Sequence, residues 1–240
     1  MKKIEKLKAF VLNKIDYSNT SYILSLYTDE YGRIDAIAKG AKKNNNKYGN
    51  TLDVLNNVEL VVYYKPETLS LITESSLINY YFNIKSNLKK LSIAYRVVEL
   101  YYHQFKHSEK NHKLYLFLDR VLNSLENNKY KDDNVLFIKF LLAFIKEVGF
   151  EMQISFCNKC NSEIQNDAYF SFTDGIICKN CVNLTNEYFN FNFELNILKK
   201  CINSSDYILN EAENNTIVNF LEKYFKYHLI DFNGFNKIIR

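Results

Sequence analysis

Two pairs of cysteines constrain the fold of this chain more than any other feature. Cys157 and Cys160 form one CxxC pair, Cys178 and Cys181 form a second, and residues 161–177 separate them. Two intervening residues let one tight turn present both thiolates to a single ion, and a second pair completes the tetrahedron. The spacing therefore predicts one Zn²⁺ held by all four cysteines, structural in role because no coordination position stays open.

The residues around the two pairs suit turns of this kind. Asn161 and Asn183 follow the pairs, and asparagine tolerates the left-handed backbone that such turns often need. Lys159 and Lys179 lie inside the pairs, where positive charge favours the thiolate form. The alternative is a set of scattered cysteines that serve as small core residues, which seldom produces two CxxC pairs at this separation.

The first 80 residues have the pattern of short strands. Runs of β-branched and aromatic residues alternate with turn-forming residues, which include the only proline, Pro66. Five strands with a long polar loop after the third predict a small closed barrel of the oligonucleotide-binding (OB) kind, with an SH3-like barrel as the alternative. The expected strands are 9–15, 22–28, 34–38, 58–64 and 69–73.

Beyond residue 80 the apolar residues recur at helical spacing. The helix expected over 135–148 is apolar nearly all round, which places it at the centre of a helical bundle. The other helices are expected over 88–106, 114–125, 195–202 and 217–229. The chain is thus predicted to be an α+β multidomain protein. Its expected parts are an OB fold over 1–80, a helical domain over 81–150 and 186–240, and a zinc-binding insertion over 151–185.

The segment from Lys39 to Gly49 is a basic loop with four lysines and no acidic residue. On an OB barrel such a loop borders the face where single strands lie. Its lysines would neutralise phosphates, Tyr48 would offer its ring to a base, and Arg33 would extend the patch. The alternative is a solvated surface loop, because charge runs are common on surfaces. The expected nucleic-acid contacts are Arg33, Lys39, Lys42, Lys43, Lys47 and Tyr48.

Composition and the absence of other motifs narrow the function. A net charge of +4 is only weak evidence for an anionic partner, because the local arrangement of charge matters more. No apolar stretch is long enough for a signal peptide or a membrane span, so a cytoplasmic protein is expected. No Walker A, HExxH, Rossmann glycine run or nucleophile elbow occurs, so no enzyme is predicted. His103 and His107, one helical turn apart, are expected to be surface residues and not metal ligands.

Taken together, these residues resemble the RecO family. The opening strands match its pattern over 9–12, 16–20, 26–28 and 31–33, and the run Lys-Gly-Ala-Lys-Lys at 39–43 matches its hallmark. Gly149-Phe150 before the first cysteine pair, and Phe170-Ser171 and Gly175 before the second, also fit. The chain departs from the family pattern at Asn161, where relatives often carry glycine, and in a loop that is rich in lysine where many relatives use arginine.

The resemblance implies a recombination mediator of bacterial DNA repair, located at the nucleoid, that carries out no covalent chemistry. Such a protein binds single- and double-stranded DNA and anneals complementary strands. The implied partners are the acidic, aromatic-ending tail of the single-strand-binding protein, RecR and, through RecR, the RecA recombinase. Two alternatives stay open at this point: a zinc-ribbon transcription or RNA-handling factor without annealing activity, and a purely structural scaffold.

Overall fold

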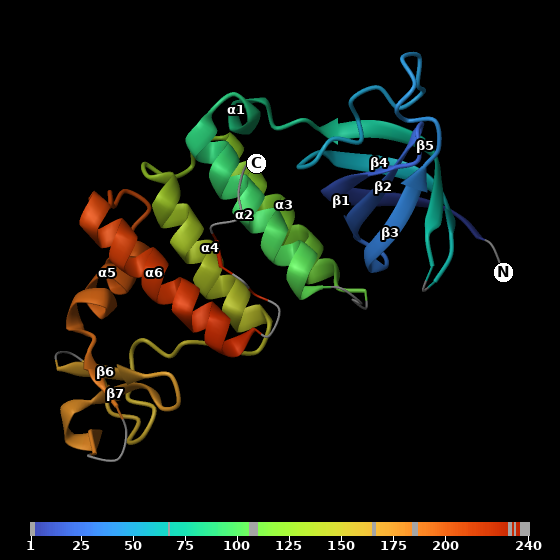
Figure 1. Ribbon diagram of the computed structural model, residues 1–240. Helices are drawn as coiled ribbons and strands as arrows, with labels where there is room; N and C mark the ends of the chain where they lie inside the picture. Colours follow the sequence, from blue (N-terminus) through green and yellow to red (C-terminus); the bar gives the residue numbers. More distant parts are fainter. Residues whose placement is uncertain are drawn as a thin grey trace. The chain divides into compact units, whose positions relative to one another are not determined.

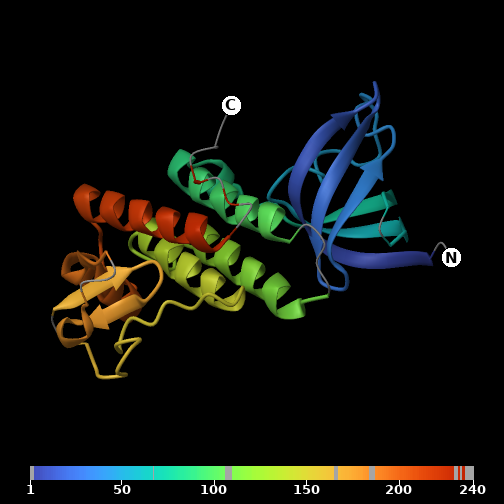
Figure 2. The ribbon, with the colours of Figure 1, turned by 60° about the horizontal axis from the view of Figure 1, so that its bottom comes forward.

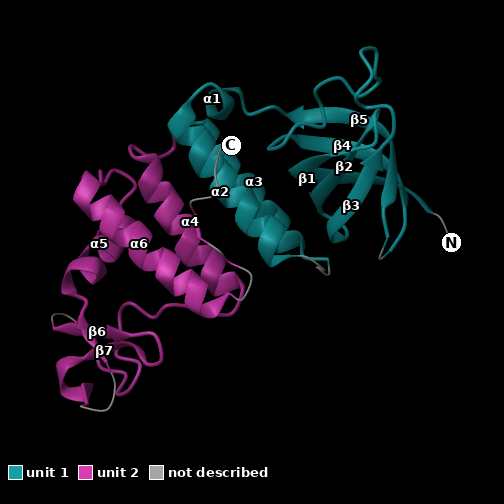
Figure 3. Cartoon of the chain, in the orientation of Figure 1, with its two compact units in different colours: residues 1–127, 238–240 teal, residues 128–237 magenta. Residues whose placement is uncertain are grey.

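The computed structural model describes residues 3–66, 68–105, 110–164, 167–183, 187–229, 232 and 234–235 of the 240-residue chain. The chain forms two compact units (Figure 3). The first unit contains residues 1–127 and 238–240, and the second contains residues 128–237. The finer division expected from the sequence, with boundaries at residues 80, 150 and 185, stays a prediction. His107 lies outside the described residues.

The first unit begins with a closed five-stranded barrel (Figure 1). The strand order is β1-β2-β3-β5-β4, β1 pairs with both β2 and β4, and β3 and β5 run parallel where they meet. This arrangement confirms the predicted OB fold. The strands are β1 (Lys3–Tyr17), β2 (Ser21–Thr28), β3 (Gly32–Ala38), β4 (Asn57–Tyr64) and β5 (Ser70–Asn79).

The barrel is held together by an apolar interior to which β1, β2, β3 and β4 contribute alternate residues and β5 contributes Ile72. Strand β1 begins earlier than the sequence pattern indicates, because its first half pairs with the whole of β4, from Lys3 opposite Tyr64 to Phe10 opposite Asn57. From Ala9 to Tyr17 the strand also pairs with β2, with an irregularity in register between Val11 and Asn13. Buried side chains that fill the interior include Leu7, Val11, Leu24, Leu26, Ala36, Val58, Leu60, Val62 and Ile72.

Three helices of the first unit follow the barrel: α1 (Phe82–Lys85), α2 (Leu88–Gln104) and α3 (His112–Glu126). The side chain of Asn87 caps α2 and that of Asn111 caps α3, each by accepting hydrogen bonds from backbone N–H groups of the first turn. Aromatic contacts join the last two helices to the outside of the barrel. Tyr101 of α2 meets Tyr27 of β2 edge-on at 5.0 Å between ring centroids, and Tyr115 of α3 lies 5.1 Å from Phe10 of β1.

The second unit contains the helices α4 (Asp133–Glu147), α5 (Asn192–Asn203) and α6 (Glu211–His228). Figure 2 shows α6 alongside α4, whose many buried apolar residues confirm its predicted central place in a helical bundle. The cap of α4 is Asp132, which accepts from the N–H of Asn134 and also from that of Leu209 at 3.1 Å. None of the described helices is long and apolar enough to cross a membrane.

Between α4 and α5 the chain forms a small sheet, in the order β7-β6-β8. Its strands are β6 (Ala168–Ser171), β7 (Gly175–Cys178) and β8 (Phe189–Asn190), and the short 3-10 helix η1 (Lys179–Cys181) follows β7 directly. The ring of Phe170 in β6 lies 5.2 Å from Phe191, at the start of α5, and 5.1 Å from Phe220 of α6. These aromatic contacts fix the sheet on the helices and so place the cysteine pairs that it carries.

Candidate metal centre and nucleic-acid surface

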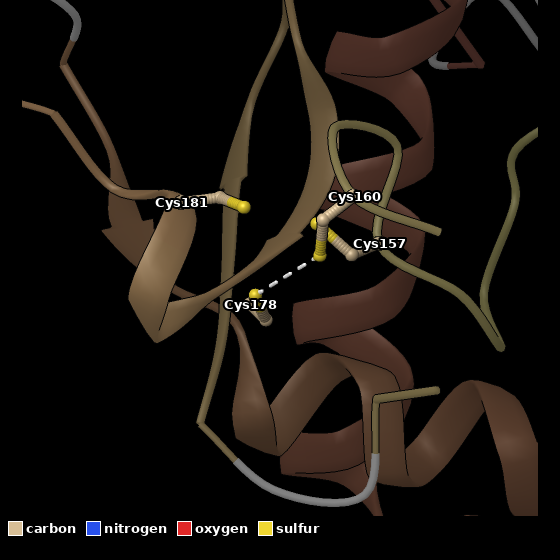
Figure 4. Close-up of side chains that lie close together, drawn as sticks. All are labelled: Cys157, Cys160, Cys178 and Cys181. Carbon is tan, nitrogen blue, oxygen red and sulfur yellow. Dashed lines mark hydrogen bonds between the residues drawn. The ribbon is translucent and has the colours of Figure 1, made fainter. Parts of the chain in front are cut away.

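The four paired cysteines converge in the second unit (Figure 4). Cys157 and Cys160 lie in a turn before the small sheet, Cys178 ends β7, and Cys181 ends η1. All four sulfur atoms lie within 4.8 Å of one another, and those of Cys160 and Cys178 are 3.7 Å apart. A set of four sulfur ligands this close could hold one metal ion in a closed coordination shell.

Backbone hydrogen bonds shape the first cysteine turn. The N–H of Asn161 donates to the carbonyl of Cys157 at 2.8 Å, and the N–H of Cys157 donates to the carbonyl of Ser162 at 2.8 Å. Asn161 has φ of +57°, so the left-handed conformation predicted for it is present. Asn183 does not belong to the described residues with positive φ, so the second turn needs no such residue there.

The surroundings of the first cysteine pair favour thiolates. The pKa of the Cys160 thiol is lowered to about 6, chiefly because the hydroxyl and the backbone N–H of Ser162 donate to its sulfur. Burial raises the pKa of Cys157, but backbone N–H groups of Cys160, Cys178 and Lys159 outweigh that effect and leave the pKa lowered. The pKa of Cys181 is instead raised to about 12, chiefly by its hydrogen bond with Cys160 and by burial. Thiolates are thus favoured at the first pair, and the set of four sulfur ligands suits a divalent metal that prefers sulfur.

The ammonium group of Lys159 has partners outside the cysteine cluster. Its Nζ donates to the hydroxyl of Tyr188 at 2.8 Å and lies 2.9 Å from a carboxylate oxygen of Asp174. These contacts raise the pKa of Lys159 to about 12. Because Tyr188 precedes β8 and Asp174 precedes β7, the lysine links the first cysteine turn to both edges of the small sheet.

The basic loop lies in the first unit, between β3 and β4. Lys39, Lys43 and Lys47 are exposed, and among the described residues none of them has an acidic partner. Lys42 differs, because its Nζ lies 2.8 Å from a carboxylate oxygen of Asp16 and its side chain is only 24% exposed. Three of the four predicted lysines are therefore free to meet an anion, and the fourth is already paired.

Tyr48 does not face solvent, which corrects the prediction that it offers its ring to a base. Its side chain belongs to the barrel interior and is 3% exposed. Its hydroxyl donates to the backbone carbonyl of Ile72 at 2.9 Å, because the loop folds back over the end of the barrel. Burial also raises the pKa of this hydroxyl. In this conformation Tyr48 anchors the loop and cannot stack on a base.

Arg33 is likewise engaged within the protein, which corrects its expected role as an extension of the patch. Its Nη1 donates to the backbone carbonyl of Tyr102 in α2 at 2.6 Å, and its guanidinium lies 4.4 Å from the centre of the Tyr102 ring. The side chain is 9% exposed. Arg33 therefore joins the barrel to α2, and a sequence-based prediction could not distinguish this structural role from a phosphate contact.

Comparison with known families identifies both parts of the chain. Residues 1–81 match the family model described as "Recombination protein O N terminal", and residues 85–231 match the one described as "Recombination protein O C terminal". The chain is also similar to proteins named "DNA repair protein RecO". The one from Chlorobium luteolum is 31% identical over 166 residues, which cover 69% of this chain and 62% of the relative.

Two further relatives extend the match. The protein from Caldanaerobacter subterraneus is 28% identical, with 73% of this chain and 70% of the relative covered. That from Thermodesulfovibrio yellowstonii is 24% identical, with 96% and 94% covered. For the relatives from Chlorobium luteolum, Pelodictyon phaeoclathratiforme and Chlorobium limicola, the matched part spans 59–62% of their length. Because the two family models together match most of the residues, the chain belongs to the RecO family of DNA repair proteins.

Proposed function

We propose that this protein is a recombination mediator that binds single- and double-stranded DNA and anneals complementary strands. The observation that carries the proposal is an OB barrel whose loop exposes Lys39, Lys43 and Lys47 without acidic partners among the described residues, in a chain of a DNA repair family. Its partners would be the tail of the single-strand-binding protein, RecR and, indirectly, RecA, at the nucleoid. The family membership supports these partners.

The proposed mechanism needs no covalent chemistry. Two DNA strands repel each other through their phosphates, and lysines that neutralise phosphates let the strands lie close enough to pair. Lys42 would contribute less than its three neighbours, because its charge is shared with Asp16. Three phosphate contacts to a single strand correspond to a log–log salt slope of about −2, by the rule of roughly −0.7 per contact.

We further propose that the ion at the four cysteines is Zn²⁺, one per chain and structural. A site of four cysteines suits tetrahedral zinc and leaves no position for a substrate. When bound, the ion would cross-link the turn at Cys157 to the end of β7, so its binding energy would contribute to the folding of residues 151–185. Cys178→Ser should lower the zinc content and destabilise this segment. A full equivalent of zinc retained in the variant, measured by metal analysis, would exclude the assignment.

The experiment that tests the function is annealing of complementary oligonucleotides coated with the cognate single-strand-binding protein, followed by fluorescence. The chain should accelerate annealing, and the triple variant Lys39→Ala, Lys43→Ala, Lys47→Ala should not. A matched control replaces three exposed lysines outside the loop, Lys113, Lys129 and Lys223, and removes the same charge. This control should retain the activity.

Two outcomes would contradict the proposal. If both triple variants lose activity to the same extent, net charge and not the loop explains the effect. If the unmodified protein gives no acceleration while its fold is intact, the mediator function is excluded. Binding to structured RNA in preference to single-stranded DNA would then favour an RNA-handling factor.

A further inference from the structure

A continuous row of apolar side chains crosses the outside of every strand of the barrel. We call these residues the outer apolar row. It begins near the end of β1, crosses β2, β3, β5 and β4 in their spatial order, and returns to the beginning of β1. In that order its members are Ile15, Ile23, Ile37, Leu71, Tyr63 and Ile4.

Each member of the row is the direct cross-strand partner of the next. Ile15 pairs with Ile23, Ile23 with Ile37, and Ile37 with Leu71 across the parallel contact of β3 and β5. Leu71 then pairs with Tyr63, and Tyr63 with Ile4. The cross-strand register of the barrel therefore brings together residues that are far apart in the sequence. Side chains of direct partners on one face of a sheet lie only about 5 Å apart, so the six residues form a continuous row.

The row faces outward and differs from the surface beside it. None of its six members belongs to the interior cluster, and Ile4, Ile15 and Tyr63 are 61%, 52% and 37% exposed. Toward the helices the neighbouring outward positions are largely polar, and they include Asn13, Ser25, Asp35 and Lys6. The outside of the barrel is thus not apolar in general, and this row is a distinct feature of it.

Positive charge borders the row on its other side. Lys39 follows Ile37 by two residues, directly after the end of β3, and the loop then carries the exposed Lys43 and Lys47. Tyr17, 49% exposed, stands two residues beyond Ile15, and Leu69, 37% exposed, stands two residues before Leu71. An apolar band with unpaired lysines along one border matches a ligand that has flat apolar faces and a charged backbone.

We propose that the bases of single-stranded nucleic acid lie on the outer apolar row while their phosphates meet the lysines of the loop. The proposal rests on the proposed function and deepens it, because it names the surface that distinguishes single strands from duplexes. In a duplex the base faces are stacked on one another, so only a single strand offers them to a surface. The row supplies the base contacts that Tyr48, buried in the interior, does not supply.

The test compares a variant of the row with a matched variant outside it. Ile23→Thr with Ile37→Thr keeps two β-branched residues in their strands and removes apolar surface at the centre of the row. Val61→Thr with Leu77→Thr makes a similar change on β4 and β5, at positions outside the row. Binding of an oligothymidine strand and of a duplex of equal length is measured by fluorescence anisotropy over a range of salt concentrations, after thermal unfolding has confirmed intact folds.

The row variant should bind the single strand about 5- to 10-fold more weakly, as expected for loss of base contacts, with an unchanged salt slope. The row variant should bind the duplex with the affinity of the unmodified protein. The control variant should bind both the single strand and the duplex like the unmodified protein. The triple lysine variant, measured in parallel, should instead bind both DNA forms more weakly and have a smaller salt slope.

If the lysine variant shows this result and the row variant binds like the unmodified protein, the row is excluded while the proposed function stands. If neither variant changes binding, both proposals fail. A row variant that keeps DNA affinity and loses binding to RecR or to the single-strand-binding protein would identify a protein interface instead.

Discussion

The hydroxyl of Tyr48 donates a hydrogen bond to the backbone carbonyl of Ile72 at 2.9 Å and thereby ties the basic loop to β5 from inside the barrel. The loop therefore has two functions in one short segment. Three of its lysines, Lys39, Lys43 and Lys47, face solvent, and its tyrosine is part of the core. Affinity for DNA and stability of the barrel should respond to different residues of the same loop.

Tyr48→Phe should lower the free energy of unfolding by about 1–2 kcal/mol, because the buried carbonyl of Ile72 loses its partner while the ring stays in place. Its affinity for DNA should not change. Urea unfolding and an anisotropy titration of the folded protein measure the two quantities. Weaker DNA binding with unchanged stability would restore Tyr48 as a contact residue and contradict its anchoring role.

Arg33→Lys should also destabilise the protein, because lysine cannot keep both the hydrogen bond to the carbonyl of Tyr102 and the flat contact with its ring. A loss of about 1–2 kcal/mol is expected in urea unfolding, although the charge is conserved. Lys39→Ala, which removes a charge at an exposed position, is the control and should leave stability nearly unchanged. Equal effects of the two substitutions would argue against a structural role for Arg33.

The left-handed backbone of Asn161 predicts a selective effect on metal binding. Asn161→Val should weaken zinc binding about tenfold, because a β-branched residue raises the cost of this conformation by roughly 1–2 kcal/mol. Asn161→Gly should bind zinc at least as well as the unmodified protein. Asn183→Val is the matched control and should show no such loss. Competition with a chelator at fixed pH measures all three variants.

The imidazole of His228 predicts how stability changes with pH. Burial lowers its pKa below the usual 6.5, and its Nε2 is buried without a hydrogen-bond partner among the described residues. As the pH falls below 6.5, the imidazole is protonated in the unfolded chain but stays neutral in the folded chain. The free energy of unfolding therefore decreases as the pH falls from 6.5 toward the lower pKa of the folded state. Urea unfolding of the zinc-saturated protein at about pH 7.5 and pH 5.5 measures this loss.

His228→Phe should reduce that pH dependence, because the ring of Phe150, 4.9 Å away, and that of Tyr224, 4.4 Å away, surround the site with apolar surface. His112→Phe, at an exposed position at the start of α3, is the matched control. If the two variants keep the same pH dependence, groups other than His228 account for it.

Local patterns predicted the elements and the cysteine site well. Alternation identified the five barrel strands, helical spacing identified α2 to α6, and the CxxC pairs identified ligands that the fold brings within 4.8 Å; the short helix α1 and the small sheet were not predicted. Each of these signals depends on residues close together in the sequence, or on a residue type with few other uses. The left-handed turn at Asn161 is equally local.

The direction of single side chains could not be predicted in the same way. Tyr48 meets Ile72 over 24 residues, and Arg33 meets Tyr102 over 69 residues. A tyrosine among lysines and an arginine beside a basic loop have the composition of a DNA contact, and only tertiary packing turns them inward. The outer apolar row was missed for the same reason, because it exists only in the cross-strand register.

The ion pair between Lys42 and Asp16 gives a last prediction for DNA binding. The Nζ of Lys42 lies 2.8 Å from the carboxylate of Asp16, whose side chain is 74% exposed, so the pair contributes little to stability and either partner can be replaced safely. Asp16→Asn should free the lysine, strengthen binding of single strands at low salt and steepen the log–log salt slope by roughly 0.7, the value for one phosphate contact.

Glu74→Gln is the control for this prediction, because it removes a negative charge elsewhere on the barrel and should leave the salt slope unchanged. In the double variant with Lys42→Ala the gain should disappear. A gain that persists without Lys42 would show that the loss of negative charge, and not the released lysine, strengthens the contact with DNA.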